Sequence, residues 1–106
     1  MMFWEPTTSP GALMIDGFEW DPIKAENNLD KHGVSFDEAA TVFVDFRAFT
    51  IPDPDHSNGE LREILLGRTL YGQLIVVSFT VRRNLVRIIS ARKANRRERK
   101  LYEKAD

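Results

Sequence analysis

The chain has 106 residues, with 16 acidic and 15 basic side chains, a net charge of −1 and no cysteine. This length accommodates one domain around a single hydrophobic core. The lack of cysteine excludes disulfides, thiol nucleophiles and cysteine-ligated zinc, and no apolar run approaches the roughly 20 residues that a membrane span needs.

Residues 1–14 carry a cluster of Pro, Thr, Ser and Gly that is typical of a loop. The segment lacks the basic and long apolar regions of a secretory signal, so we expect no targeting peptide and a cytoplasmic location. Met14 is an alternative start. We expect a loosely ordered extension over residues 1–14 and a single domain over residues 15–106, which begins with a short strand at Ile15–Trp20.

A first helix is predicted from Pro22 to His32. Asp21 is a favourable N-cap, proline suits the first helical position, and Gly33 suits the C-cap. One face is expected to pack and the other to be polar and cationic. The packing face carries Ala25, Leu29 and His32, and the polar face carries Lys24, Asn27, Asn28 and Lys31.

A second helix is predicted to begin after Ser35 and to end at about Phe43 or Val44. Ser35 and Glu38 have the spacing of a capping box, in which each side chain bonds the backbone amide of the other residue. The apolar residues that follow recur at helical spacing, so we expect this stripe to lie in the core. They are Phe36, Ala39, Ala40 and Phe43.

Two strands and a loop are predicted next. Asp45–Thr50 alternates aromatic and polar residues, as a strand does, and Ile51–Gly59 is a loop rich in Pro, Asp, Asn and Gly. Arg62–Thr69 alternates again and predicts another strand, followed by a turn at Tyr71-Gly72.

The longest apolar segment predicts two adjacent central strands. Leu74–Val77 is a run of apolar residues typical of a strand that is covered on both faces, and Arg82–Asn84 has the length of a hairpin loop. Strict alternation along Leu85–Ala91 would place Val86, Ile88 and Ser90 on one face and Arg87, Ile89 and Ala91 on the other.

A last helix is predicted after Lys93, with Asn95 as its cap and Glu98 at the capping-box position. Its thin apolar stripe comprises Leu101, Tyr102 and Ala105. The order of elements predicts an α+β domain. We expect a small, mostly antiparallel sheet of about four or five strands, with two N-terminal helices and a C-terminal helix.

Charge is distributed unevenly along the chain. Residues 1–60 hold twelve acids against three Lys or Arg, whereas residues 82–106 hold ten Lys or Arg against three acids. This polarity indicates a polyanion-binding C-terminal region, and the alternative is that folding brings the two halves together and neutralises them.

Four segments carry a resemblance to a known family. They are FEWDPIKAENNLDKHGVSFDEAATVF, the DPDHS loop, GELREILLG and SFTVRRNLVRIISARKANRRERKLY. Together they resemble the BrnT family of ribonuclease toxins over about residues 16–103. The resemblance implies a RelE-like fold and a partner, a BrnA-type ribbon-helix-helix antitoxin. It also implies that the toxin contacts promoter DNA only indirectly, through this antitoxin.

The resemblance also implies an endoribonuclease that blocks translation and needs no metal ion. In such enzymes the ribose 2′-hydroxyl attacks the adjacent phosphorus, so a proton acceptor, phosphate-binding cations and an acid are required. Arg92, which follows Ser90 at the end of a strand, and Arg82 at the hairpin are the first candidates for the cations.

The proton-transfer candidates are less distinctive. His56 can exchange protons near neutral pH, but a histidine in a turn also commonly bonds a neighbouring carboxylate. Lys24 is a candidate to support the transition state, with a solvated helix face as the alternative. The remaining RNA-binding candidates are basic residues that exposure alone would also explain: Lys31, Arg62, Arg83, Lys93, Arg96 and Arg97.

No cofactor or resident metal is expected. Asp53, Asp55 and His56 are close in sequence, yet no second cluster at ligand spacing accompanies them. A different class of function stays open, namely a non-catalytic module that lends its basic face to DNA within an antitoxin complex.

Overall fold

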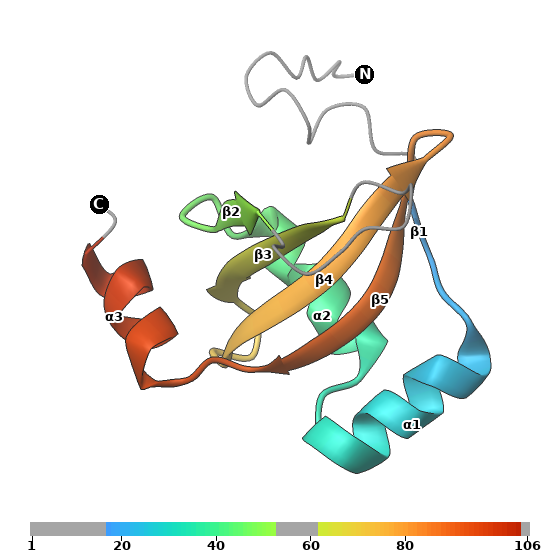
Figure 1. Ribbon diagram of the computed structural model, residues 1–106, viewed down its shortest axis with the longest axis horizontal. Helices are drawn as coiled ribbons and strands as arrows, with labels where there is room; N and C mark the ends of the chain where they lie inside the picture. The colour runs from blue at the N-terminus through green and yellow to red at the C-terminus, as the bar shows by residue number, and fades with distance from the viewer. Residues whose placement is uncertain (1–16, 53–61, 105–106) are drawn as a thin grey trace, which may run out of the picture.

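The computed structural model describes residues 17–52 and 62–104 (Figure 1). Its elements are β1 (Gly17–Glu19), α1 (Pro22–His32), α2 (Phe36–Ala40), the 3-10 turn η2 (Thr41–Val44), β2 (Phe49–Pro52), β3 (Glu63–Arg68), β4 (Leu74–Arg82), β5 (Leu85–Lys93) and α3 (Arg96–Lys104). The predicted α+β fold is confirmed. The expected extension, His56 and Ala105 lie outside the described residues, and within these no helix is long and apolar enough to span a membrane.

The described strands form one sheet in the order β1-β5-β4-β3-β2. β1 runs parallel to β5, and the other neighbours are antiparallel. Residues Leu74–Val77 lie in β4, the central strand, and are buried, so the predicted central strand is confirmed. The predicted strand at Arg62–Thr69 and the turn at Tyr71-Gly72 are also confirmed.

Two apolar clusters lie on opposite faces of the sheet. The larger one joins α1, α2 and η2 to the sheet and includes Phe36, Val42, Ile75, Val77 and Ala91. The smaller one lies under α3, whose buried contribution is Tyr102, packed against Leu66, Leu74 and Val76. One face of the sheet is therefore covered by α1 and α2, whereas the other face is covered only at one end, by α3 (Figure 1).

The two N-terminal helices begin as predicted. The Asp21 carboxylate accepts hydrogen bonds from the amides of Ile23 at 2.8 Å and Lys24 at 3.3 Å, and Gly33 closes α1 in the left-handed conformation with φ 72°. Ser35 Oγ accepts from the Glu38 amide at 3.0 Å, whereas the Glu38 carboxylate accepts from Thr69 Oγ1 at 3.1 Å, so one half of the predicted capping box is observed. The last turn before Val44 is 3-10 rather than α-helical.

The predicted faces of α1 are partly wrong. Asn28, expected on the polar face, is buried, whereas Leu29, expected to pack, is half exposed. Asn28 is buried because it bonds the edge of β5. Its side-chain amide donates to the Ala91 carbonyl at 2.8 Å and accepts from the Ala91 backbone amide at 3.1 Å. Because these backbone groups lie beyond the end of β1, a side-chain amide satisfies them in place of a strand.

Residues 45–48 form a turn, so the strand predicted at Asp45–Thr50 begins later, at Phe49. Asp45 Oδ1 accepts from the Arg47 amide at 2.9 Å and Asp45 Oδ2 from the Arg68 amide at 2.8 Å. An aspartate that bonds the amide two residues on favours a turn over a strand.

The predicted faces of β5 are wrong in its second half. Ser78 pairs with Ser90 but Phe79 pairs with Ile88, so Ile89 is an extra residue and the pairing shifts by one. Such a bulge reverses the alternation beyond it. Ala91 therefore shares the core face with Val86 and Ile88, and Ser90 faces the opposite side.

Candidate functional site

The sheet face opposite α1 and α2 brings polar side chains from β4 and β5 together. Directly paired residues share a face, and the register pairs Ser78 with Ser90 and Val76 with Arg92. Val76 belongs to the cluster under α3, which places Arg92 and Ser90 on that same face. Both are partly exposed. Ser90 and Arg92 share a face because they are two residues apart, and the bulge is the reason that this face is the open one.

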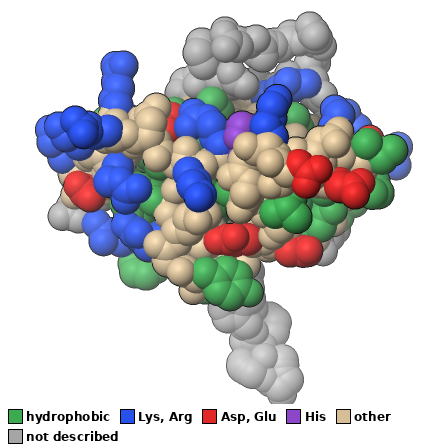
Figure 2. Space-filling view, turned by 90° about the horizontal axis from the view of Figure 1, so that it is seen from below, with side chains coloured by type: hydrophobic (Ala, Val, Ile, Leu, Met, Phe, Trp, Pro, Cys, Tyr) green, Lys and Arg blue, Asp and Glu red, His purple; other side chains and the backbone are tan. Residues whose placement is uncertain are grey.

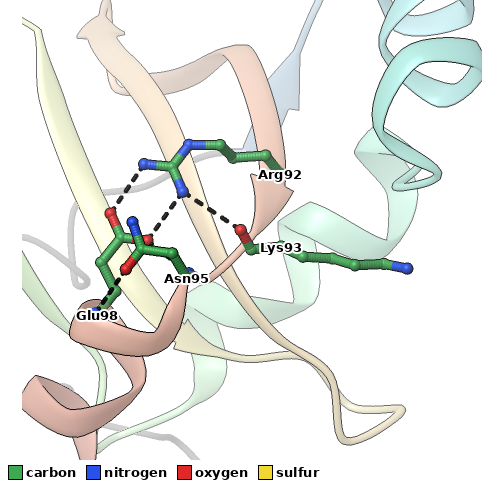
Figure 3. Close-up of polar contacts among 4 residues, drawn as sticks. All are labelled: Arg92, Lys93, Asn95 and Glu98. Carbon is green, nitrogen blue, oxygen red and sulfur yellow. Dashed lines mark hydrogen bonds and ion pairs between the residues drawn. The ribbon is translucent and has the colours of Figure 1, made fainter.

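Arg92 is held at the start of α3 by a bidentate ion pair (Figure 3). Its Nη1 and Nη2 atoms donate to Glu98 Oε1 and Oε2, each at 2.8 Å, and Nη1 also donates to the Lys93 carbonyl at 3.3 Å. Glu98 is fixed in turn, because its carboxylate accepts from the Asn95 amide at 2.9 Å while Asn95 Oδ1 accepts from the Glu98 amide at 2.8 Å. The predicted capping box of the last helix is confirmed, and it anchors the arginine.

The ion pair fixes the charge state of both partners. Its hydrogen bonds raise the pKa of Arg92 and lower that of Glu98 from their usual values. The Arg92 side chain is 42% exposed and the Glu98 side chain 15%, so the cation faces solvent while its partner is largely enclosed. A positive charge that is both permanent and fixed in position is suited to binding a phosphate.

α3 extends this positive charge over a larger surface. Its exposed cations include Arg96, Arg97, Arg99 and Lys100. Figure 2 shows Lys and Arg side chains gathered at the left end, where α3 lies in Figure 1, and acidic side chains mainly in the right half. Lys93 is also exposed, but its side chain leaves β5 in the direction opposite to Arg92 (Figure 3). The predicted basic C-terminal surface therefore exists in the folded chain.

The other predicted site residues lie elsewhere. Arg82 and Arg83 lie at the β4–β5 hairpin. The strand rises by seven steps from Leu85 to Arg92, which separates that turn from Arg92 by about 23 Å at ~3.3 Å per residue. Lys24 and Lys31 are exposed on α1, which packs on the opposite face of the sheet.

Two further candidates are placed less completely. Arg62 directly precedes β3 and is partly buried, with an Nε atom that has no hydrogen-bond partner. His56 lies outside the described residues. Among the part of the chain that the structure describes, no group of three His, Asp or Glu side chains could hold a metal ion.

A polar cluster that sequence reasoning missed fixes the far end of α3. The Tyr102 hydroxyl donates to Asp45 Oδ2 at 2.8 Å, and the guanidinium carbons of Arg47 and Arg68 each lie 5.4 Å from the centre of the Tyr102 ring. Backbone hydrogen bonds from Arg68 and Arg47 lower the Asp45 pKa despite the opposing effect of burial, whereas burial raises the Tyr102 pKa. No sequence signal joins residues 57 positions apart.

Comparisons with known proteins place the chain in context. A family model described as the ribonuclease toxin BrnT of type II toxin-antitoxin systems matches residues 20–98. The crystal structure of the Brucella abortus ribonuclease toxin BrnT is similar, with a TM-score of 0.58 and 24% sequence identity, over 76% of this chain and 97% of that one. At this identity the structural likeness shows a shared fold. No curated protein sequence matches significantly.

Proposed function

The chain belongs to the BrnT family of ribonuclease toxins of type II toxin-antitoxin systems, and we propose that it cleaves RNA by a metal-independent reaction. The family match agrees with the resemblance of its sequence motifs. The observation that supports a site is the position of Arg92, a fixed cation at the junction of the open sheet face and the basic helix α3.

The proposed reaction uses the substrate's own hydroxyl as nucleophile. The ribose 2′-oxygen attacks phosphorus while its proton passes to a base, and the 5′-oxygen leaves with a proton from an acid. The products are a 2′,3′-cyclic phosphate and a 5′-hydroxyl. Arg92 stabilises the charge on the phosphorane, an effect that is worth several kcal/mol for a preorganised donor, and Ser90 lies beside it on the same face. His56 stays the candidate for proton transfer, and Lys24 stays a candidate to support the transition state.

RNA is proposed to run from Arg92 along the basic end of the molecule. Arg96 and Arg97 on α3 contact successive phosphates, and Lys93 holds the strand where it turns toward α1 and Lys31. At its distance from Arg92, the hairpin pair of Arg82 and Arg83 contacts a different phosphate. Arg62, before β3, is proposed to bind RNA from the other side of the open face.

The proposed partner is a ribbon-helix-helix antitoxin of the BrnA type. We propose that it binds this chain in the cytoplasm and that the chain has a RelE-like fold. The exposed acidic residues of α1, such as Glu26 and Asp30, offer a docking surface for a basic segment of that partner. Binding of this kind weakens as ionic strength rises. A toxin-antitoxin affinity that is unaffected by salt would contradict the electrostatic part of the proposal.

The test is to induce this chain alone, as the Arg92→Ala variant, and together with the product of the neighbouring gene. We expect growth arrest and new 5′-hydroxyl RNA ends for the unmodified chain, and relief by both the substitution and the partner. Purified protein should cleave RNA equally well in the presence of EDTA.

Unimpaired growth with intact RNA would instead support the non-catalytic alternative, in which the basic surface serves DNA binding within an antitoxin complex. Growth arrest with RNA cleavage that EDTA abolishes would contradict the metal-independent mechanism but would still support ribonuclease activity.

A further inference from the structure

The way Arg92 is bound leaves one of its two hydrogen-bonding edges available. A guanidinium has five N–H groups and can present a parallel pair either from its two terminal nitrogens or from Nε and Nη2. Glu98 occupies the terminal edge at 2.8 Å to each nitrogen, and the Lys93 carbonyl takes a second hydrogen of Nη1. Within the described part of the chain these are the hydrogen-bond partners of Arg92, so the Nε–Nη2 edge is left for a ligand.

The open edge points away from the helix that holds the residue. In Figure 3 the hydrogen-bonded nitrogens of Arg92 lie toward Glu98 and Asn95, while the Nε end lies on the side away from α3. The side chain is 42% exposed. A phosphate that approaches over the open sheet face therefore meets this edge without displacing Glu98.

Glu98 is better suited to stay in place than to give way. Its side chain is only 15% exposed, and its carboxylate also accepts from the Asn95 amide in the capping box. Displacing it would break three hydrogen bonds, one of which is half of the capping box. A flexible arginine would instead lose side-chain entropy when it bound a phosphate, and Glu98 removes that cost by holding the guanidinium plane beforehand.

We propose that the Nε–Nη2 edge of Arg92 is the phosphate-binding edge of the site, and that Glu98 is the positioning residue that aims it at the scissile phosphate. This inference rests on the proposed ribonuclease function and names the residue on which its arginine depends. The arrangement lowers the net charge of the site by one but gives the cation a single orientation.

The kinetic test compares Glu98→Gln with Glu103→Gln, which removes the same charge from an exposed position on the same helix. Glutamine retains an oxygen for the Asn95 amide but cannot accept from both terminal nitrogens of Arg92. We expect kcat for RNA cleavage to fall roughly ten- to a hundredfold in Glu98→Gln, as for other small misplacements of catalytic groups, with KM nearly unchanged. Glu103→Gln should cleave as the unmodified chain does. A Glu98→Gln variant that cleaves equally well, or binds RNA more tightly because a competing carboxylate is gone, overturns the proposal.

A second measurement is independent of turnover. The Nε–H resonance of Arg92 is followed by NMR while a short 2′-O-methyl RNA, which cannot be cleaved, is added to the full chain. We expect this resonance to shift in the unmodified chain and to shift less in Glu98→Gln, a difference that a merely structural role of Glu98 would not produce.

The two measurements separate the possible failures. A chain that never cleaves RNA but shows the Nε–H shift would refute the proposed function and leave the phosphate edge standing. RNA binding without that shift, or no RNA binding at all, refutes the proposed edge.

Discussion

Asn28 takes the place of a neighbouring strand at the edge of β5. β1 pairs with β5 only as far as Arg87, and the backbone groups of Ala91 lie beyond it. The Asn28 amide bonds both of these groups and also donates to the Val34 carbonyl at 3.0 Å. One buried side chain therefore joins α1, the loop after it and the strand that leads to Arg92.

We expect Asn28→Ala to lower the free energy of unfolding by roughly 2–4 kcal/mol, because it leaves buried backbone groups without partners. Urea denaturation measures this change. Asn27→Ala is the matched control, since Asn27 is the exposed neighbour on the same helix and its loss should have little effect. Equal destabilisation by the two variants would contradict the assigned role of Asn28.

Gly67 permits the close approach of β3 to the turn at residues 45–48. A Cβ atom there would lie 2.6 Å from Ala48 Cβ and 2.8 Å from Val42 Cγ1. We expect Gly67→Ala to destabilise the fold by about 1–3 kcal/mol through overpacking. Thermal unfolding of a double-mutant cycle with Ala48→Gly checks the cause, because removal of the Ala48 methyl should recover part of the loss. Strictly additive effects would show that the contact is not responsible.

α3 depends more on polar contacts than on apolar burial. Among its described residues Tyr102 is the buried side chain, and Leu101, which the sequence pattern assigned to the apolar stripe, is 45% exposed. The helix is held at one end by Glu98 against Arg92 and at the other by Tyr102 against Asp45. Its attachment is thus governed by ionisation at both ends.

The pKa shifts give this attachment a defined pH window. Glu98 and Asp45 have lowered pKa values in the folded chain, so their contributions are present above the usual values of 4.5 and 3.8 and are lost as the pH falls through the folded values. The pKa of Tyr102 is raised, so its contribution is present below 10.0 and is lost as the pH rises through the folded value.

We therefore expect stability to fall when the pH is lowered from about 6 to about 3, and Glu98→Gln to show a smaller fall because its side chain does not titrate. Urea denaturation at both pH values measures the difference. Glu103→Gln serves as the control for the loss of an exposed carboxylate. If Glu98→Gln and the unmodified chain lost the same free energy, the ion pair would not be part of the acid sensitivity.

Local patterns sufficed for most elements of the fold. The caps of α1 and α3 and the apolar run of β4 depend on neighbours within a few residues, and each was predicted from them. The sequence could not reveal the bulge at Ile89, because the extra residue is defined only by its pairing with Ser78 and Phe79. The face that Ser90 occupies was predicted wrongly for that reason.

The candidate site was predictable as a list of residue types but not as an arrangement. Arginines at the end of a strand and on a basic helix are visible in the sequence, whereas the separation of Arg82 from Arg92 depends on the length and direction of β5. Tyr102 and Asp45 meet only because α3 packs against β3, whose Arg68 amide donates to Asp45.

Over the whole molecule, folding leaves much of the charge polarity of the sequence in place. Ion pairs join Arg87 to Glu19 and Arg92 to Glu98, yet the cations of α3 stay exposed at one end (Figure 2). A nearly neutral protein can thus bind a polyanion through one pole.

We expect the logarithm of the binding constant for the 2′-O-methyl RNA to fall linearly with the logarithm of the salt concentration. Replacing both Arg96 and Arg97 by Ala should reduce that slope by roughly 1.4, at about 0.7 per phosphate contact on a single strand. Fluorescence anisotropy over a salt series measures it. The same series for Arg82→Ala with Arg83→Ala shows whether the hairpin also lies on the RNA path. An unchanged slope for the α3 variant would remove that helix from the interface.

The bulge in β5 also leaves a signature in the tolerance of the chain to random substitution. In a saturation mutagenesis survey read out by protein abundance, the intolerant positions should be two residues apart at Val86 and Ile88, and the next one should follow three residues later, at Ala91. A Fourier analysis of that profile would find two segments of strand period with opposite phase. Deletion of Ile89 would join them into one phase and leave Ser90 on the open face and Ala91 in the core, because it removes the extra residue between the pairs Phe79–Ile88 and Ser78–Ser90.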